Sequence, residues 1–225
     1  DVKSQVTVEE TNDGNRIDSI LISTMHDQIL DVESVRSMLT QQIRENQIGL
    51  HENIHSMIDI NTKIFINPAG QWNVGGPVSD CGLTGRKIVV DQYGPYCPVG
   101  GGAFSGKDPS KCDRSGAYLA RYIAKNLVAA GVTDKCKVEI AYMIGVSDPS
   151  SINIDTFGEC DDELLSNVVS KIFPMTPQET LDHLNLTSPI YLNTAKNGHF
   201  GNNTLPWENL DKVSNIQKEL KHSMV

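Results

Sequence analysis

The sequence predicts an α+β fold of successive similar units, in which helices pack on one face of a mixed or antiparallel sheet. Three observations support this class. Short segments that alternate apolar and polar residues, such as 4–9 and 16–24, are typical of half-buried strands. Longer segments with apolar residues three or four positions apart, such as 32–45 and 115–130, are typical of helices. Between them, residues 75–116 are rich in glycine and proline and follow neither period, which usually indicates a functional loop.

The first part of the chain is expected to form a ββαββ unit that is incomplete at its beginning. Residues 4–9 and 16–24 have the pattern of strands, and the intervening TNDGN is typical of a turn, so they predict an antiparallel hairpin. Apolar spacing predicts a helix over 32–45, for which Asp31 is a suitable N-cap. Short strands at 63–67 and 72–74, separated by the turn NPAGQW, complete the expected unit.

The second part of the chain carries further strands and helices. A strand is expected at 88–90, and the alanine-rich segment 115–130 predicts a helix that ends before Gly131. The sequence TPQE, beginning at Thr176, has the pattern of a capping box that opens another helix. The remaining expected elements are strands at 137–146 and 152–157 and helices at 161–173 and 211–222. We therefore expect two domains, 1–76 and 77–225.

Composition and charge limit the classes of function. The net charge of −9 argues against a nucleic acid or an anionic membrane as partner. The chain has no run of about 18 apolar residues, so no transmembrane helix is expected. The five cysteines are widely spaced and form no CxxC pair, which predicts free thiols in a reducing compartment, the cytoplasm.

One local segment departs from the acidic character of the whole. Residues 86–114 carry five basic and three acidic side chains, a net charge of +2. A basic segment in an acidic protein is typical of a small-anion site. A solvated charged loop would have the same composition, so this observation alone leaves both interpretations open.

The stretch GGGAFSGKDPSKCDRSGAY, residues 100–118, contains most of a Walker A loop. Gly101, Gly106 and Lys107 have the right spacing, but Asp108 stands where the motif needs a hydroxyl for Mg²⁺. A Walker A loop also follows a buried strand and opens a helix at its lysine. Here PYCPVG precedes the loop, and DPSKCDRS separates Lys107 from the expected helix. We conclude that the stretch is not a damaged P-loop.

The same residues nevertheless suit a polyphosphate. Consecutive glycines let backbone N–H groups approach phosphate oxygens closely, because no Cβ intervenes. Lys107 and Lys111 offer two ammonium groups, and Asp113 offers an oxygen ligand to a Mg²⁺ ion that would share the phosphate charge. A salt-bridged surface loop is the alternative.

Several long segments resemble the S-adenosylmethionine synthetase (methionine adenosyltransferase) family. Besides the glycine-rich stretch, they are DVKSQVTVE, INPAGQWNVGGPVSDCGLTGRKIVVDQYG, AYMIGVSDPSSI and GHFGNNTLPWE, in the family's order, so the resemblance runs from Asp1 to about Trp207. It implies that the methionine sulfur attacks C5′ of ATP and that the released triphosphate is cleaved to diphosphate and phosphate. A thioether has no proton to lose, so this chemistry needs alignment and cations rather than a general base.

The resemblance also implies roles for individual residues. The expected catalytic residues are Lys107, Arg86, Lys87 and Lys111. The expected ATP-binding residues are Asp1, Lys3, Gln71, Trp72, Asp80, Arg86, Lys87, Ala103 and Lys107. Methionine is expected at Asp80, Lys111 and Ile144, and Asp113 is the expected ligand of one of two Mg²⁺ ions. The family further implies a K⁺ ion and a homodimer or homotetramer with active sites between its subunits.

The chain departs from the family pattern in three places. Gln71-Trp72 stands where an Arg-Phe pair is usual, and Trp72 offers a larger π-face for adenine while Gln71 carries no charge. Residues 96–98 (YCP) replace a pattern of small residues and histidine, for which we have no functional explanation. The family's N-terminal portion, with its HPDK element and further metal and K⁺ ligands, has no counterpart, so the chain alone is expected to be inactive.

Two other functions are considered. A non-catalytic regulatory or scaffold protein would not need all the retained charged residues, which argues against it. A generic NTPase would release phosphate from ATP without methionine. His199 is expected to be structural, because attack by a neutral thioether needs no base there. Trp207 is expected to belong to the core, because large aromatic residues are more often core than ligand.

Overall fold

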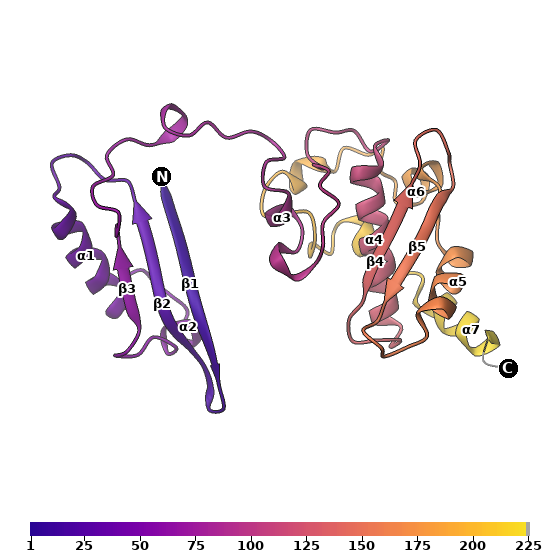
Figure 1. The fold of residues 1–225 in the computed structure, drawn as a ribbon, viewed down its shortest axis with the longest axis horizontal. Coiled ribbons are helices and arrows are strands. Elements are labelled where there is room, and N and C mark those ends of the chain that lie inside the picture. Colours follow the sequence, from indigo (N-terminus) through magenta and orange to yellow (C-terminus); the bar gives the residue numbers. More distant parts are fainter. Residues whose placement is uncertain (224–225) are drawn as a thin grey trace. The chain divides into compact units, whose positions relative to one another are not determined.

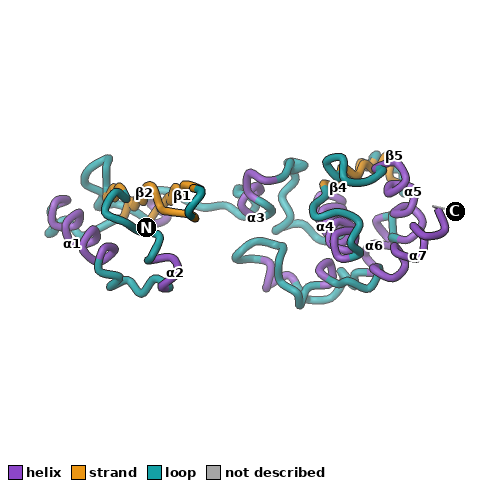
Figure 2. Tube along the Cα trace, turned by 90° about the horizontal axis from the view of Figure 1, so that it is seen from below, coloured by secondary structure: helices purple, strands orange, loops and turns teal. Residues whose placement is uncertain are grey.

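The computed structural model describes residues 1–223, and the chain divides into two compact units, Asp1–Gly82 and a second that starts at Leu83. Each unit, taken by itself, holds a small sheet with helices on one side of it (Figures 1 and 2). The predicted α+β class is therefore confirmed, whereas the boundary expected between residues 76 and 77 stays a prediction. Within residues 1–223 every helix is too short or too polar to span a membrane.

The sheet of the first unit is mixed. β1 (Val2–Thr11) and β2 (Gly14–Thr24) form the predicted antiparallel hairpin. β3 (Lys63–Ile66) lies on the other edge of β2 and runs parallel to it. The predicted strand at 72–74 is wrong. This segment meets the end of β2 through a hydrogen bond from the His26 N–H to the Trp72 carbonyl, and the glycines that follow do not continue a ladder.

Helix α1 (Val32–Arg44) covers one face of this sheet and begins as predicted after Asp31. The Asp31 carboxylate accepts a hydrogen bond of 2.9 Å from the Ser34 N–H, and the bonds from Ser34 lower the pKa of Asp31. A short helix, α2 (Glu52–His55), precedes β3. The apolar face of α1 packs on the strands through Val35 and Ile43, which meet Ile17, Ile20 and Ile66 in one buried cluster.

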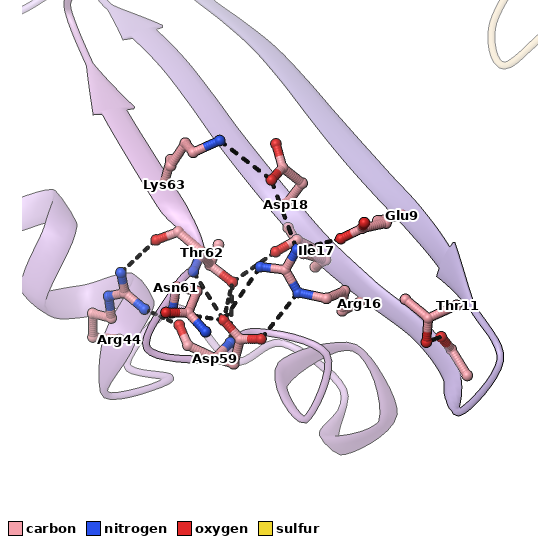
Figure 3. Close-up of polar contacts among 11 residues, drawn as sticks. Glu9, Thr11, Arg16, Ile17, Asp18, Arg44, Asp59, Asn61, Thr62 and Lys63 are labelled. Carbon is pink, nitrogen blue, oxygen red and sulfur yellow. Dashed lines mark hydrogen bonds and ion pairs between the residues drawn. The ribbon is translucent and has the colours of Figure 1, made fainter.

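Polar contacts fix the loop before β3 to β2 (Figure 3). Arg16 of β2 donates from Nε to Asp59 at 3.0 Å, and the hydrogen bond from Arg16 is the main cause of the lowered pKa of Asp59. Thr62 donates from its hydroxyl to the Ile17 carbonyl at 2.7 Å. Arg44, at the end of α1, donates to the Thr62 carbonyl at 2.6 Å. Because these bonds join β2, α1 and the loop, they set the point at which β3 begins.

The second unit is built around helix α4 (Cys112–Ala129), which begins earlier than the predicted residue 115. β4 (Lys137–Tyr142) and β5 (Pro149–Asp155) form an antiparallel pair beside it. β4 ends before the predicted residue 146, because residues 143–146 turn back with a hydrogen bond from Val146 to Met143. The inner face of α4 is fully buried, with Tyr118, Leu119, Tyr122, Ile123 and Leu127 packed around Trp207 and Leu165.

The predicted helices near the C-terminus are present. They are α5 (Asp162–Ile172), α6 (Pro177–His183) and α7 (Val213–Ser223). The capping box of α6 is formed, since Thr176 Oγ1 accepts from the Glu179 N–H and the Glu179 carboxylate accepts from the Thr176 N–H. Short 3₁₀ turns occur at Gly76–Val78, Gly94–Tyr96, Tyr191–Thr194 and Pro206–Glu208.

The predicted strand at 88–90 is wrong. These residues form a short helix, α3 (Ile88–Asp91), in which the Asp91 N–H donates to the Lys87 carbonyl at 2.8 Å. Three β-branched residues favour a strand locally, but the Asp91 carbonyl accepts a hydrogen bond from the His199 N–H at 3.1 Å. The segment thus packs against a distant loop instead of a strand, and tertiary contact overrides local propensity.

Candidate functional site

The glycine-rich loop passes directly over the first turn of α4. A Cβ placed on Gly102 would lie 2.3 Å from Cγ of Asp113 and 2.4 Å from its Oδ1, closer than real side chains approach. Gly101 and Gly106 have φ of +83° and +90°, the left-handed region that favours glycine. The glycines therefore let the main chain reach the Asp113 carboxylate while the loop turns sharply on either side.

Lys107 meets this same carboxylate. Its Nζ lies 2.8 Å from Oδ2 of Asp113, and the two side chains are 34% and 52% exposed. A pair this exposed contributes about 0–1 kcal/mol to stability. It therefore holds both groups in position without binding them so strongly that a ligand could not separate them.

Asp108, which stands at the hydroxyl position of the Walker motif, instead pairs with Lys111 and Ser110. Its carboxylate lies 2.9 Å from Nζ of Lys111 and accepts hydrogen bonds from the hydroxyl and N–H of Ser110. These bonds, from Ser110 first and then Lys111, lower the pKa of Asp108 well below its usual range. Because α4 starts only at Cys112, Lys107 does not open a helix. The rejection of a P-loop is thus supported by geometry.

Two further cations lie on the segment next to the loop. A Cβ on Gly85 would lie 2.6 Å from Cβ of Ala103, and one on Gly106 would lie 3.6 Å from Thr84 Cγ2, so the two segments run in contact. Arg86 and Lys87 follow Gly85 directly, and both are exposed. Neither forms an ion pair with any residue among 1–223. Their charges are therefore not cancelled by any carboxylate among the described residues.

A buried arginine supports the loop from below. Arg114 is 4% exposed, and its guanidinium donates to the Lys107 carbonyl at 2.6 Å, to the Tyr118 hydroxyl at 3.1 Å and to the Thr194 hydroxyl at 3.3 Å. The guanidinium carbon also lies 4.0 Å from the centre of the Tyr191 ring. Sequence reasoning missed this residue, because its acceptor Thr194 and its ring partner Tyr191 lie far along the chain.

His199 is buried, as a structural histidine should be. Its Nδ1 lies 2.8 Å from the Tyr118 hydroxyl, its Nε2 lies 3.3 Å from Ser105 Oγ, and its carbonyl accepts from Trp207 Nε1 at 2.8 Å. Burial, together with the charge of Arg114, lowers the pKa of His199. Trp207 is fully buried and stacks on Tyr118 with ring centres 3.7 Å apart, so it belongs to the core.

Three of the expected ATP-binding residues come together in the first unit. Asp1 Oδ2 accepts a hydrogen bond of 2.6 Å from the Gly76 N–H, and a Cβ on Gly75 would lie 2.9 Å from that oxygen. Lys3 Nζ lies 6.0 Å from the centre of the Trp72 ring. Asp1, Lys3 and Trp72 thus line one end of the sheet around Gly75 and Gly76.

Other expected site residues lie apart from these groups. Gln71 turns away from them, since its Nε2 donates to the Leu30 carbonyl at 3.1 Å. Asp80 is exposed and forms no ion pair within residues 1–223. Ile144 lies in the turn after β4 with its side chain fully exposed, and it is not among the residues that line the cavity beside the glycine-rich loop. The roles expected for all three stay predictions.

A cavity of about 960 Å³ opens beside the loop within the second unit. Its walls come from α4, β4 and the segment 92–104, and Gly102 and Asp113 lie on its lining. Arg121 and Lys125 also line it, and both bind the buried carboxylate of Glu208, at 2.9 and 2.7 Å. Burial raises the pKa of Glu208, but the hydrogen bonds from these two cations outweigh it and lower the pKa overall.

The oxygen ligands available here fit a magnesium site that is completed by the substrate and water. No three His, Cys, Asp or Glu side chains within residues 1–223 converge on one point, which argues against a cage made of these residues alone. Mg²⁺ commonly binds through one or two carboxylates and completes its shell with phosphate oxygens and water. The Asp113 carboxylate, exposed above Gly102, suits that arrangement.

Two family profiles and several relatives match the chain. The profile described as S-adenosylmethionine synthetase, central domain, matches residues 1–72, and that of the C-terminal domain matches residues 74–209. The S-adenosylmethionine synthase of Finegoldia magna is 48% identical, over 98% of this chain and 56% of the relative. That of Clostridium tetani is 49% identical, over 96% of this chain and 56% of the relative.

A solved structure gives the same result. It is described as an unusual S-adenosylmethionine synthetase from Campylobacter jejuni, and it matches with a TM-score of 0.78 and 36% identity over 98% of this chain and 60% of that one. The chain spans about half the length of the curated relatives it matches. With both profiles matched in order along the chain, it belongs to the S-adenosylmethionine synthetase family, of which it carries the central and C-terminal domains.

Proposed function

We propose that the chain is part of a methionine adenosyltransferase, which transfers the adenosyl group of ATP to the sulfur of methionine. One observation carries the proposal: the Lys107–Asp113 pair lies over Gly102, beside two exposed cations that no carboxylate in the described part of the chain neutralises. Such a site suits a polyphosphate leaving group. The remaining site residues are proposed to come from the amino-terminal part that the relatives have, so the chain alone is inactive.

Lys107 changes partner when the polyphosphate binds. In the free protein its ammonium is neutralised by Asp113 at 2.8 Å. An incoming phosphate oxygen replaces that carboxylate, and the exchange costs little because an exposed pair contributes about 0–1 kcal/mol. Lys107, together with Arg86 and Lys87, then stabilises the negative charge that develops on the triphosphate as the C5′–O bond breaks. Lys111 is released from Asp108 in the same way and lies toward methionine.

Asp113 is proposed to hold Mg²⁺, which would supply further positive charge to the triphosphate oxygens when bound. A second Mg²⁺ and a K⁺ ion stay predictions of the family resemblance. Trp72 is proposed to stack on adenine, with Asp1 and Lys3 beside it. The remaining proposed contacts are Gln71, Asp80 and Ala103 to ATP and Asp80 and Ile144 to methionine.

A homodimer or homotetramer with active sites between subunits is proposed as the working form. Every residue of β1 is exposed, including Val2, Val6 and Val8, which are 66%, 53% and 48% exposed. An exposed strand with apolar side chains usually acquires a partner. Light scattering of the full-length protein that gives a monomer mass would contradict this. A cytoplasmic location is proposed on the free thiols of all five cysteines, each of which lies within the described residues.

The test uses the full-length protein, in which this sequence is joined to the amino-terminal part that the relatives have. Lys107→Ala should abolish most S-adenosylmethionine formation, whereas Lys218→Ala, at an exposed position on α7, should leave it unchanged. Equal activity of the two variants would favour a scaffold protein. Phosphate release from ATP without methionine would indicate a generic NTPase.

A further inference from the structure

Arg114 carries a buried charge that no carboxylate in the described part of the chain pairs with. The guanidinium is 4% exposed, and within residues 1–223 it forms no ion pair. Its acceptors are a carbonyl and two hydroxyls, of Lys107, Tyr118 and Thr194, and they are neutral. Burying a charge without a counter-charge is unfavourable, so a residue that only filled space here would be apolar.

The position of Arg114 connects the two members of the Lys107–Asp113 pair. Arg114 follows Asp113 in the first turn of α4, and its terminal nitrogen donates to the main-chain carbonyl of Lys107 at 2.6 Å. Lys107 Nζ in turn lies 2.8 Å from Asp113. A single side chain thus ties the main chain of the loop lysine to the helical turn that carries the loop carboxylate.

A second set of hydrogen bonds connects Arg114 to the loop, through Tyr118 and His199. An arginine Nε can only donate, so the Tyr118 oxygen accepts from it and has its own proton to donate to Nδ1 of His199. A neutral His199 then carries its proton on Nε2 and donates it to Ser105 Oγ at 3.3 Å. The Tyr118 hydroxyl and both ring nitrogens of His199 thus have partners of the right kind, and Ser105 lies in the loop two residues before Lys107.

We propose that Arg114 is a positioning residue of the polyphosphate site. It acts through Lys107, whose main chain it anchors, and through the chain Tyr118, His199 and Ser105, which anchors the same loop a second time. The proposal rests on the proposed function of the loop.

The experiment is a double-mutant cycle in the full-length protein. Arg114→Met, Lys107→Ala and the combination of both are compared for binding of magnesium tripolyphosphate by calorimetry and for S-adenosylmethionine synthesis. Arg114→Met should lower kcat about 100-fold, the effect of displacing a site residue by roughly 1 Å, with the methionine KM changed by less than about threefold. Because Arg114 acts through Lys107, the double variant should be no worse than Lys107→Ala alone.

Arg44→Lys is the matched control, since Arg44 also donates to two main-chain carbonyls, those of Asp59 and Thr62, but in the first unit. If Arg114→Met does not fold, Arg114→Lys carries the test. Its single ammonium keeps the charge but cannot serve three acceptors, so tripolyphosphate affinity should fall about tenfold.

The outcomes separate the two proposals. If Lys107→Ala abolishes synthesis but Arg114→Lys behaves like Arg44→Lys, the positioning role is overturned and the proposed function stands. Fully additive losses in the double variant would likewise overturn the positioning role, since they would indicate a general effect on stability. If neither Lys107→Ala nor Arg114→Met changes synthesis, the proposed function of the loop itself has failed.

Discussion

Replacing Gly102 by alanine tests the geometry of the loop with a single methyl group. The added Cβ would lie 2.3 Å from Cγ of Asp113, whereas ordinary contacts begin at 3.4 Å. Gly102 does not have the positive φ that would make alanine strained, so the contact alone is changed. Cβ of Asp113, which side-chain rotation cannot move, would also lie only 2.6 Å from the added methyl group. The loop and the first turn of α4 must therefore separate by about 1 Å, which carries the Asp113 carboxylate away from Lys107.

The effects on stability and on activity are expected from different causes. Overpacking the contact between the loop and α4 costs about 1–3 kcal/mol, and loss of the exposed pair adds about 0–1 kcal/mol. The free energy of unfolding should therefore fall by about 1–4 kcal/mol. A displacement of about 1 Å at a site that aligns reactants lowers the rate about 100-fold, which corresponds to about 2.7 kcal/mol in the barrier.

The assay is S-adenosylmethionine formation by the full-length protein, with urea unfolding in parallel. Gly100→Ala is the matched control, because its Cβ would meet no atom within 4 Å and its φ is not in the positive range. If Gly102→Ala retains activity within about threefold of this control, Asp113 does not need its position over the loop. The assignment of Asp113 to the polyphosphate site would then be refuted.

Three other predictions concern stability and thiol chemistry. Glu208→Gln should lower the free energy of unfolding by about 3 kcal/mol in urea titrations, because two cations lose a fully buried carboxylate. The control Asp182→Asn, at an exposed carboxylate, should change it by less than about 0.5 kcal/mol. Equal shifts in the two variants would contradict this prediction. Burial raises the pKa of Cys136 to about 11, so at pH 8 a disulfide reagent should modify exposed Cys81 first, and Cys81→Ser should remove the fast phase. Because the pKa of His199 is lowered on folding, the unfolded chain binds more protons than the folded protein below about pH 6.5. The free energy of unfolding should therefore fall as the pH drops from about 6.5. Measured between about pH 8 and pH 5, this decline should be smaller in His199→Asn.

The elements that sequence reasoning predicted correctly are those whose signals lie within a few residues. The Asp31 cap satisfies the N–H of Ser34, three positions on, and the Thr176 box closes with Glu179 over the same interval. The first hairpin is encoded in the same local way by a turn between two alternating segments. These interactions need no partner from elsewhere in the chain, so a single sequence is enough to predict them.

The two wrong strands show the limit of local signals. A run of β-branched residues at 88–90 has strand propensity, yet a strand exists only where another strand pairs with it. The described part of the second unit offers that pairing to β4 and β5 alone, and residues 88–91 instead contact His199. Residues 72–74 likewise meet the end of β2 at His26 without forming a ladder.

In the candidate site, too, local features are predictable from the sequence and long-range contacts are not. The pattern of glycines, lysines and Asp113 predicts an anion loop, because residue types and spacing suffice for that inference. That Lys107 and Asp113 pair with each other over Gly102 depends on how the loop folds back on α4, which spacing does not specify. Arg114 was counted only as one more basic residue, since nothing near it in the sequence indicates burial.

The structure shows which charges of the segment 86–114 are paired and which are not. Its lysines at 107 and 111 are paired with carboxylates, while Arg86 and Lys87 are exposed and free of such partners within residues 1–223. The exposed positive charge beside the loop is therefore that of Arg86 and Lys87. Under the proposed function, these two residues would attract a polyphosphate, and the loop lysines would become available when phosphate oxygens displace their carboxylates. Asp113, released from Lys107 in that exchange, would then be the proposed ligand of the metal, so one carboxylate would stabilise the loop in both states.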